Sequence, residues 1–163
     1  MIFVSIKKIL NTVQIIAFTH RQFNFDEIGL FHLDDKQRID VLTDLKTNLD
    51  IDELMYLSTC NRVEFIINHK KEITKTFVEE LIKELLAEKV PTNLSDIVDR
   101  AEIINNKAAV HHIFSVASSI DSLVVGEREI ITQVRKAFEE CRENKLCGDV
   151  IRVLVQSTIS TAK

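Results

Sequence analysis

The sequence predicts an α+β fold: a split β-α-β antiparallel sheet, in the order β-α-β-β-α-β, with additional C-terminal helices. Two observations carry the prediction. Short runs of β-branched and aromatic residues alternate with longer segments whose apolar residues recur every three or four positions. The 163 residues also include only three glycines and one proline, too few for a loop-rich or all-β fold. We expect the helices between the strands to lie on one face of the sheet.

The first strand is expected at residues 12–19, a run rich in β-branched residues. The apolar run at residues 1–18 is interrupted by two lysines and two amides, so we interpret it as strand and not as a signal peptide, with residues 2–6 as an extra strand or an irregular arm. A short helix is expected around residues 26–31. Asp34 is expected to cap the next helix, with Gln37 three residues later as its capping-box partner.

Two more strands, at 54–57 and 63–68, are expected on either side of a polar bend. Residues 71–89 have the clearest helical stripe, and Pro91 follows it, as is common beyond a helix end. A short strand at 101–104 completes the sheet. This order places the polar bend between the second and third strands, at one end of the sheet.

Three helices are expected after the sheet, at residues 106–118, from about 126 to 141 and at 149–163. The last of them reaches Lys163 without a cap, a glycine or a proline. A helix that lacks a stop signal indicates that the chain continues in the natural protein.

Composition and charge exclude several classes of function. The net charge is −4, so binding of a nucleic acid needs a local basic patch, for which Arg21, Arg135 and Lys136 are candidates. The three glycines are far apart, which excludes a glycine-rich dinucleotide-binding loop in this chain. The apolar N-terminal run is too short and too polar to cross a membrane, and we expect no membrane partner.

The three cysteines, Cys60, Cys141 and Cys147, show no Cys-x-x-Cys spacing, so neither a zinc site nor a redox disulfide is indicated. We expect no metal. Unpaired cysteines of this kind favour a cytoplasmic location. Cys141 lies in the apolar stripe of its helix and is expected in the core.

The polar bend holds Cys60 within Leu57-Ser58-Thr59-Cys60-Asn61-Arg62-Val63-Glu64. Arg62 is two residues away, and a nearby cation favours the thiolate, the form that attacks a carbonyl carbon. A buried structural cysteine is the alternative, and it is the commoner fate of an isolated cysteine. The residues of the bend leave both interpretations open.

His112, in the helix at 106–118, lies nearly opposite the apolar stripe of that helix, beside Ala108 and Val116. A histidine off the packing stripe is free to serve a functional site. The alternative is a solvated histidine, and the helical spacing alone favours that alternative.

Two stretches go beyond general patterning. Leu57 to Glu64 resembles the nucleophile motif of glutamyl-tRNA reductases, the first committed enzymes of five-carbon tetrapyrrole synthesis. Residues 117–127, Ala-Ser-Ser-Ile-Asp-Ser-Leu-Val-Val-Gly-Glu, followed by Gln-Val-Arg-Lys-Ala at 133–137, resemble the second signature of that family. His112 lies just before this signature, where the family has its active-site histidine. The resemblance covers about residues 10–163.

The resemblance implies a ferredoxin-like N-terminal catalytic domain at residues 1–145, followed at 146–163 by the truncated start of the long linker (spinal) helix. The NADPH-binding and dimerisation domains of the family are then absent from this chain. In the family reaction, a cysteine thiolate attacks the aminoacyl ester of glutamyl-tRNA. NADPH then reduces the thioester to glutamate-1-semialdehyde, the precursor of 5-aminolevulinate and porphyrins.

The resemblance also implies partners. They are the glutamyl-tRNA substrate, a second copy of the full-length enzyme bound through its dimerisation domain, and glutamate-1-semialdehyde aminomutase for handover of the product. NADPH is the implied cofactor, bound by the absent domain and not by this chain. We expect this fragment alone only to form or hydrolyse the thioester.

Carried over by position, Cys60 is the implied nucleophile and His112 the implied proton-handling histidine. Arg62 is suited both to favour the thiolate and to hold the side-chain carboxylate of the substrate. His20 matches a family histidine that supports the pocket. The implied substrate-binding residues are Thr59, Cys60, Asn61, Arg62, Ser122, Glu127, Arg128, Glu129 and Gln133.

One departure bears on the site. The family pattern Glu-Pro-Gln is replaced here by Glu127-Arg128-Glu129, which adds a negative charge. Glu129 is thereby placed to pair with Arg62 or with the α-amino group of the substrate. The altered segment and the absent cofactor domain also leave a second hypothesis, a catalytically inert binding or regulatory module on the same scaffold.

Overall fold

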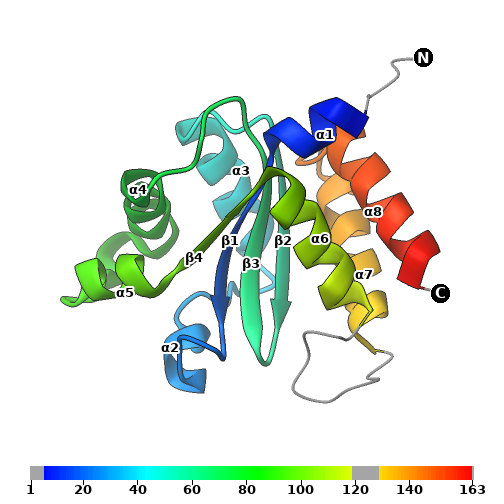
Figure 1. Ribbon diagram of the computed structural model, residues 1–163. Coiled ribbons are helices and arrows are strands. Elements are labelled where there is room, and N and C mark those ends of the chain that lie inside the picture. The colour runs from blue at the N-terminus through cyan, green and yellow to red at the C-terminus, as the bar shows by residue number, and fades with distance from the viewer. Residues whose placement is uncertain (1–5, 119–128, 163) are drawn as a thin grey trace.

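In the computed structural model, which describes residues 6–118 and 129–162, four strands form one antiparallel sheet in the order β2-β3-β1-β4 (Figure 1). The α+β class predicted from the sequence is confirmed. The elements are α1 (Ile6–Thr12), β1 (Val13–Thr19), α2 (Phe25–Gly29), α3 (Arg38–Asn48), β2 (Glu53–Thr59), β3 (Arg62–Asn68), α4 (Lys75–Leu86), the 3-10 helix η1 (Ala87–Lys89), α5 (Leu94–Arg100), β4 (Glu102–Asn105), α6 (Asn106–Ala117), α7 (Glu129–Glu143) and α8 (Asp149–Ala162).

Helices cover both faces of the sheet, and the longer helices between the strands share one of these faces, as expected. In Figure 1, α3, α4 and α5 lie on one side of the strands, and α1, α6, α7 and α8 lie on the other. Every side chain of β1 and of β3 is buried as a result. Cover on both faces explains why these strands appear in the sequence as nearly continuous apolar runs and not as alternating patterns.

Residues 6–12 form a helix and not part of the strand that the sequence indicated, while the strand or arm expected at residues 2–6 lies, except for Ile6, outside the described residues. Ile9 of α1 is buried, and the helix packs against α6 and α8. Lys7 and Lys8, which interrupt the apolar run, are exposed. The β-branched composition favoured a strand, but contacts with two distant helices stabilise the helical form.

The capping box belongs to α2 and not to α3. The side-chain oxygen of Asn24 accepts from the backbone N–H of Glu27 at 2.9 Å, and the Glu27 carboxylate accepts from the N–H of Asn24 at 2.9 Å. Asp34 instead accepts from the N–H of Lys36 at 2.8 Å, so its carboxylate closes a local turn. Gln37 is the N-cap of α3 and makes no side-chain capping bond. The predicted Asp34 cap is therefore wrong.

An aromatic cluster holds the aperiodic segment that precedes α3. The rings of Phe18 and Phe31 stack with centroids 3.9 Å apart. The hydroxyl of Tyr56 donates to the carbonyl of Phe31 at 2.9 Å and accepts from the N–H of Leu33 at 3.0 Å. These bonds fix the segment against β2, and they hold the start of α3 beside that strand.

Glu53, at the start of β2, caps α8 from across the fold. One carboxylate oxygen accepts from the backbone N–H groups of Gly148 and, at 3.1 Å, of Ile151, while the other accepts from the Asn68 amide at 2.8 Å. The first N–H groups of a helix have no partner inside it, so the carboxylate satisfies two of them and interacts favourably with the helix dipole. A Cβ atom at Gly148 would lie 3.2 Å from this carboxylate, which explains the glycine.

Replacing Glu53 by alanine is expected to lower the free energy of unfolding by about 2–3 kcal/mol, because two N–H groups and a buried amide lose their acceptor. Urea denaturation measures the change. Glu79→Ala is the matched control, since Glu79 makes only a half-exposed pair with Lys83, and we expect little change there. Equal losses at the two positions would contradict a specific role for Glu53.

Candidate active site

Cys60 lies at the tip of the β2–β3 hairpin. Thr59 and Arg62 are its last paired residues, so Cys60 and Asn61 form a two-residue turn. The side chain of Cys60 is exposed. The N–H of Asn61 donates to the Thr59 hydroxyl at 3.2 Å, and its carbonyl accepts from the N–H of His20 at 3.0 Å. The predicted strand, bend and strand are confirmed, and the thiol is not a buried structural group.

Behind this turn, Glu64 joins two of the predicted site residues. The Arg62 guanidinium donates to Glu64 at 2.8 Å, and Nε2 of His112 lies 2.9 and 3.0 Å from the two carboxylate oxygens. Glu64 is fully buried, Arg62 is 3% exposed and His112 is 12% exposed. Arg62 and Glu64 are two residues apart on β3, so their side chains project from the same face of the sheet, the face that α6 covers. Within the described residues, His112 is linked to the Cys60 turn through this carboxylate.

His112 is therefore not the solvated histidine that the spacing favoured. The buried residues of α6 are Ala109, Ile113, Val116 and Ala117, a face that lies closer to His112 than the predicted stripe does. The helix packs on the sheet with one side and on α1 and α8 with another, so its apolar residues are spread over more than one of its faces. The periodicity of the apolar residues alone could not show which of them face the sheet and which face α1 and α8.

Glu64 is an ionised carboxylate. Burial by itself raises its pKa, but the hydrogen bond and the charge of His112, together with Arg62, lower the pKa below the ordinary value of 4.5. A carboxylate only accepts hydrogen bonds, so Nε2 of His112 carries the hydrogen that points to Glu64. Nδ1 is then the nitrogen that takes up or releases a proton, and Glu64 sets the tautomer of the ring.

His20 lies beside the same turn. Its pKa is lowered by burial first and then by the positive charges of Arg62 and Arg21, while the carbonyl of Asn61 acts in the opposite direction. The ring is therefore neutral at pH 7. Its Nδ1 is buried and has no hydrogen-bond partner in the described part of the chain.

A small cavity of about 30 Å³ lies against the turn. Gln133, from the second turn of α7, faces the hairpin across it. The cavity thus brings together five predicted substrate-binding residues from two distant parts of the chain. It is lined by Thr59, Cys60, Asn61, Arg62, Val116, Ile130 and Gln133.

Of the other predicted substrate-binding residues, the structure describes only Glu129, which does not line this cavity. Glu129, the first residue of α7, is exposed and forms no ion pair within the described residues, and its pairing with the α-amino group of the substrate stays a prediction. Arg62 pairs with Glu64. Ser122, Glu127 and Arg128 lie outside the described residues, and their roles stay predictions.

Glu64 is not among the predicted site residues, although it lies within the motif that holds Cys60. A signal was present: Glu64 is an acid in the middle of an apolar strand, two residues after an arginine. A charged side chain in such a strand needs a partner when both faces of the sheet are buried. The two-residue spacing puts Arg62 on the same face as Glu64 and indicates it as the first partner. The second partner, His112, is brought to Glu64 only by the fold.

The other two cysteines differ from Cys60. Cys141 is buried in α7, as predicted, and burial raises the pKa of its thiol to about 11. Burial also raises the pKa of the Cys147 thiol, to about 12, so both are protonated at neutral pH. Among the described residues, no cluster of His, Cys, Asp or Glu could hold a metal ion, and no helix is long and apolar enough to cross a membrane.

Comparisons with known proteins agree with the resemblance seen in the motifs. The family described as "Glutamyl-tRNAGlu reductase, N-terminal domain" matches residues 16–163. The chain is 38% identical over 137 residues to a glutamyl-tRNA reductase of a Nitratiruptor species, covering 82% of this chain and 31% of the relative. It is 34% identical over 141 residues to that of Campylobacter concisus, covering 86% and 32%.

The fold has a solved counterpart as well. The structure of glutamyl-tRNA reductase from Methanopyrus kandleri matches with a TM-score of 0.73 and 21% identity, over 93% of this chain and 33% of that chain. The chain spans about a third of the length of the curated relatives it matches. The family match covers nearly the whole chain, and the sequence relatives agree with it. The chain therefore belongs to the family of glutamyl-tRNA reductase N-terminal domains.

Proposed function

We propose that this chain is the catalytic domain of a glutamyl-tRNA reductase, in which Cys60 attacks the aminoacyl ester of glutamyl-tRNA. The observation that carries the proposal is the exposed thiol of Cys60 in front of a buried cluster of Arg62, Glu64 and His112. Covalent catalysis needs an accessible nucleophile and a nearby group that handles its proton. Membership of the family supports a glutamyl ester of tRNA as the substrate.

The proposed step is an acyl transfer from oxygen to sulfur. The thiol of Cys60 loses its proton, a bond forms between Sγ and the ester carbonyl carbon, and the ester C–O bond breaks. The ribose oxygen leaves and takes up a proton, so the products are a thioester and tRNA with a free terminal hydroxyl. We assign the proton transfer to His112, because Glu64 holds Nε2 and leaves Nδ1 to exchange protons.

We assign the side-chain carboxylate of the glutamyl group to Arg62. A guanidinium has five N–H donors, so its hydrogen bond to Glu64 does not exhaust it, and its planar fork suits a carboxylate. Arg62 also lines the cavity beside Cys60. The other residues that we propose for substrate binding are Thr59, Asn61, Ser122, Glu127, Arg128, Glu129 and Gln133.

Reduction of the thioester by NADPH to glutamate-1-semialdehyde is proposed for the full-length protein. The described residues do not fit a dinucleotide. One helix, α8, begins directly after a glycine, but the Glu53 carboxylate occupies its N-terminus and would repel a pyrophosphate. We therefore derive no hydride step from this chain and assign it to a separate nicotinamide-binding domain.

The wider proposal follows the family. The strand order β2-β3-β1-β4 supports a ferredoxin-like catalytic domain at residues 1–145, with the linker helix beginning in 146–163. We propose an oxidoreductase of tetrapyrrole synthesis that forms a homodimer through a C-terminal domain of the full-length enzyme and passes its product to the aminomutase. Three free cysteines support the proposed cytoplasmic location.

The test is a trapping experiment with the 163-residue chain and tRNA charged with radiolabelled glutamate. We expect acid quenching to recover a glutamyl thioester on the peptide that contains Cys60, with slow release of free glutamate as water reaches it. Hydroxylamine should remove the label, as it does from thioesters. Label on another residue would refute the assignment of Cys60, and absence of label would favour an inert binding module.

A further inference from the structure

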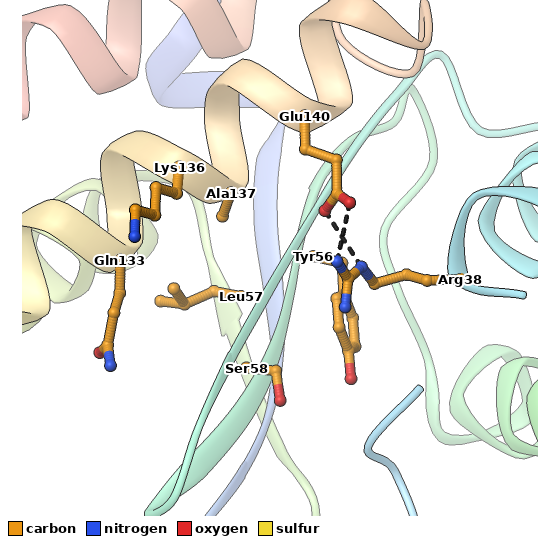
Figure 2. Close-up of a pocket in the computed structure, with 8 residues that line it drawn as sticks. All are labelled: Arg38, Tyr56, Leu57, Ser58, Gln133, Lys136, Ala137 and Glu140. Carbon is orange, nitrogen blue, oxygen red and sulfur yellow. Dashed lines mark hydrogen bonds and ion pairs between the residues drawn. The ribbon is translucent and has the colours of Figure 1, made fainter. Parts of the chain in front are cut away.

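A second, larger pocket adjoins the Cys60 turn between β2 and α7. Its volume is about 370 Å³, within the range of small-molecule sites. In Figure 2, Gln133 and Lys136 extend from α7 on one side of the pocket, and the pair of Arg38 and Glu140 closes the other side. The pocket is lined by Arg38, Tyr56, Leu57, Ser58, Gln133, Lys136, Ala137 and Glu140.

This pocket shares a lining residue with the cavity at Cys60. Gln133 lines both, and Ser58 in the pocket is followed directly by Thr59 in the cavity. The cavity, at about 30 Å³, has room for about one water molecule. Of the two, only the pocket has room for a group the size of a nucleoside.

The charges of the pocket are unevenly placed. At one end, Arg38 donates to both oxygens of Glu140 at 3.0 and 2.7 Å and to Asp35 at 2.6 Å, so this end has no excess positive charge. Lys136 is exposed and makes no hydrogen bond or ion pair within the described residues. Its ammonium group gives the pocket a positive charge in a chain whose net charge is −4.

We propose that this pocket binds the terminal nucleotide of the aminoacylated tRNA, with Lys136 on its phosphate. This inference rests on the proposed function. The carbonyl that Cys60 attacks is esterified to the ribose of that nucleotide, so the ribose lies beside the turn when the ester bond breaks. The phosphate of the same nucleotide is on the opposite side of the sugar, and it therefore points away from Cys60.

The spacing on α7 matches this arrangement. Lys136 lies three residues after Gln133, about 4.5 Å further along the helix axis and on the same face. The Gln133 amide and the Ser58 hydroxyl are placed for the ester oxygen and the one free hydroxyl of the ribose, and Leu57 and Ala137 form the apolar part of the wall. A lysine suits a phosphate as a compact cation that imposes no fixed orientation.

The structure also separates two basic residues that the sequence left equivalent. Arg135, next to Lys136 on α7, lines a different pocket together with Phe138, Glu139 and Arg142. It lies on another face of the helix and does not border the Cys60 turn. Arg135→Ala is therefore a matched control for Lys136→Ala, because the two variants remove the same charge from adjacent helix positions.

The first test is a titration with adenosine 5′-monophosphate, followed by amide chemical shifts of the isotopically labelled chain. We expect the largest shifts at residues 56–58 and 133–140, which line the pocket. Lys136→Ala is expected to weaken binding of the nucleotide about tenfold, and Lys136→Arg to restore most of it. Adenosine, which lacks the phosphate, is expected to bind both proteins alike. Shifts elsewhere, no binding, or an equal loss in Arg135→Ala would overturn the proposal.

The second test uses the reaction with glutamyl-tRNA. In Lys136→Ala we expect a higher half-saturating concentration, an unchanged maximal rate, and a salt dependence whose logarithmic slope is shallower by about 0.7. An unchanged half-saturating concentration would remove the pocket assignment and leave Cys60 as the nucleophile. Nucleotide binding at the pocket without any Cys60 adduct would refute the proposed function alone, since the titration involves no reaction.

Discussion

Replacement of Cys60 by serine is expected to lower the rate of glutamyl transfer from tRNA by roughly 10³-fold or more. A serine hydroxyl stays protonated at neutral pH, whereas a thiol supplies some thiolate, which is also the better nucleophile. The turn is exposed, so we expect the free energy of unfolding to change by less than about 0.5 kcal/mol. Acid-quenched kinetics with radiolabelled glutamyl-tRNA measure the rate, and urea denaturation measures the stability.

Cys147→Ser is the control for this variant. Cys147 lies in the connection between α7 and α8, away from the hairpin, and its thiol is protonated at neutral pH. We expect this variant to accept the glutamyl group at the parent rate. A Cys60→Ser protein that labels as fast as its parent would show that the nucleophile lies elsewhere.

Replacement of Glu64 by glutamine is expected to affect both stability and transfer. The buried ion pair between Arg62 and Glu64 is then broken, which costs about 3 kcal/mol. The amide also presents a donor as well as an acceptor to Nε2, so it no longer selects one tautomer of His112. We expect the rate of glutamyl transfer to fall by roughly 10²-fold.

The control is Glu102→Gln. Glu102 and Glu64 both pair with Ala17, from opposite neighbouring strands, but Glu102 is only half-buried. We expect that variant to change stability by less than about 0.5 kcal/mol and to keep the transfer rate. A Glu64→Gln protein that loses stability but transfers glutamate at the parent rate would show that Glu64 is structural only.

The stability lost in Glu64→Gln is expected to depend on pH. The pKa of Glu64 is lower in the folded protein than its ordinary value of 4.5, so the unfolded chain takes up this proton first as the pH falls. The stabilisation by Glu64 is therefore complete above about pH 4.5 and is lost as the pH falls through the folded-state pKa. Urea denaturation at several pH values should show the two proteins converging below pH 4.5; a constant difference would contradict this account.

Much of the fold could be predicted because the local signals are strong. Residues 54–57 and 63–68 were placed within two residues of β2 and β3, and the bend between them fell at Cys60. The positions of α7 and α8 along the chain were also predicted. The errors have a common cause: Asp34 and residues 6–12 were interpreted by local propensity, while the structure there is decided by a competing turn and by packing on distant helices.

The sequence by itself determined the α+β class, the family, and a cysteine presented at a tight bend. Only the tertiary structure decided what surrounds that cysteine. His112 meets Glu64 across 48 positions of sequence, and Gln133 and Lys136 reach the hairpin from a helix with no local relation to it. Local spacing reports which face of an element is apolar, but a buried carboxylate finds its partners by packing, and no periodic pattern encodes that contact.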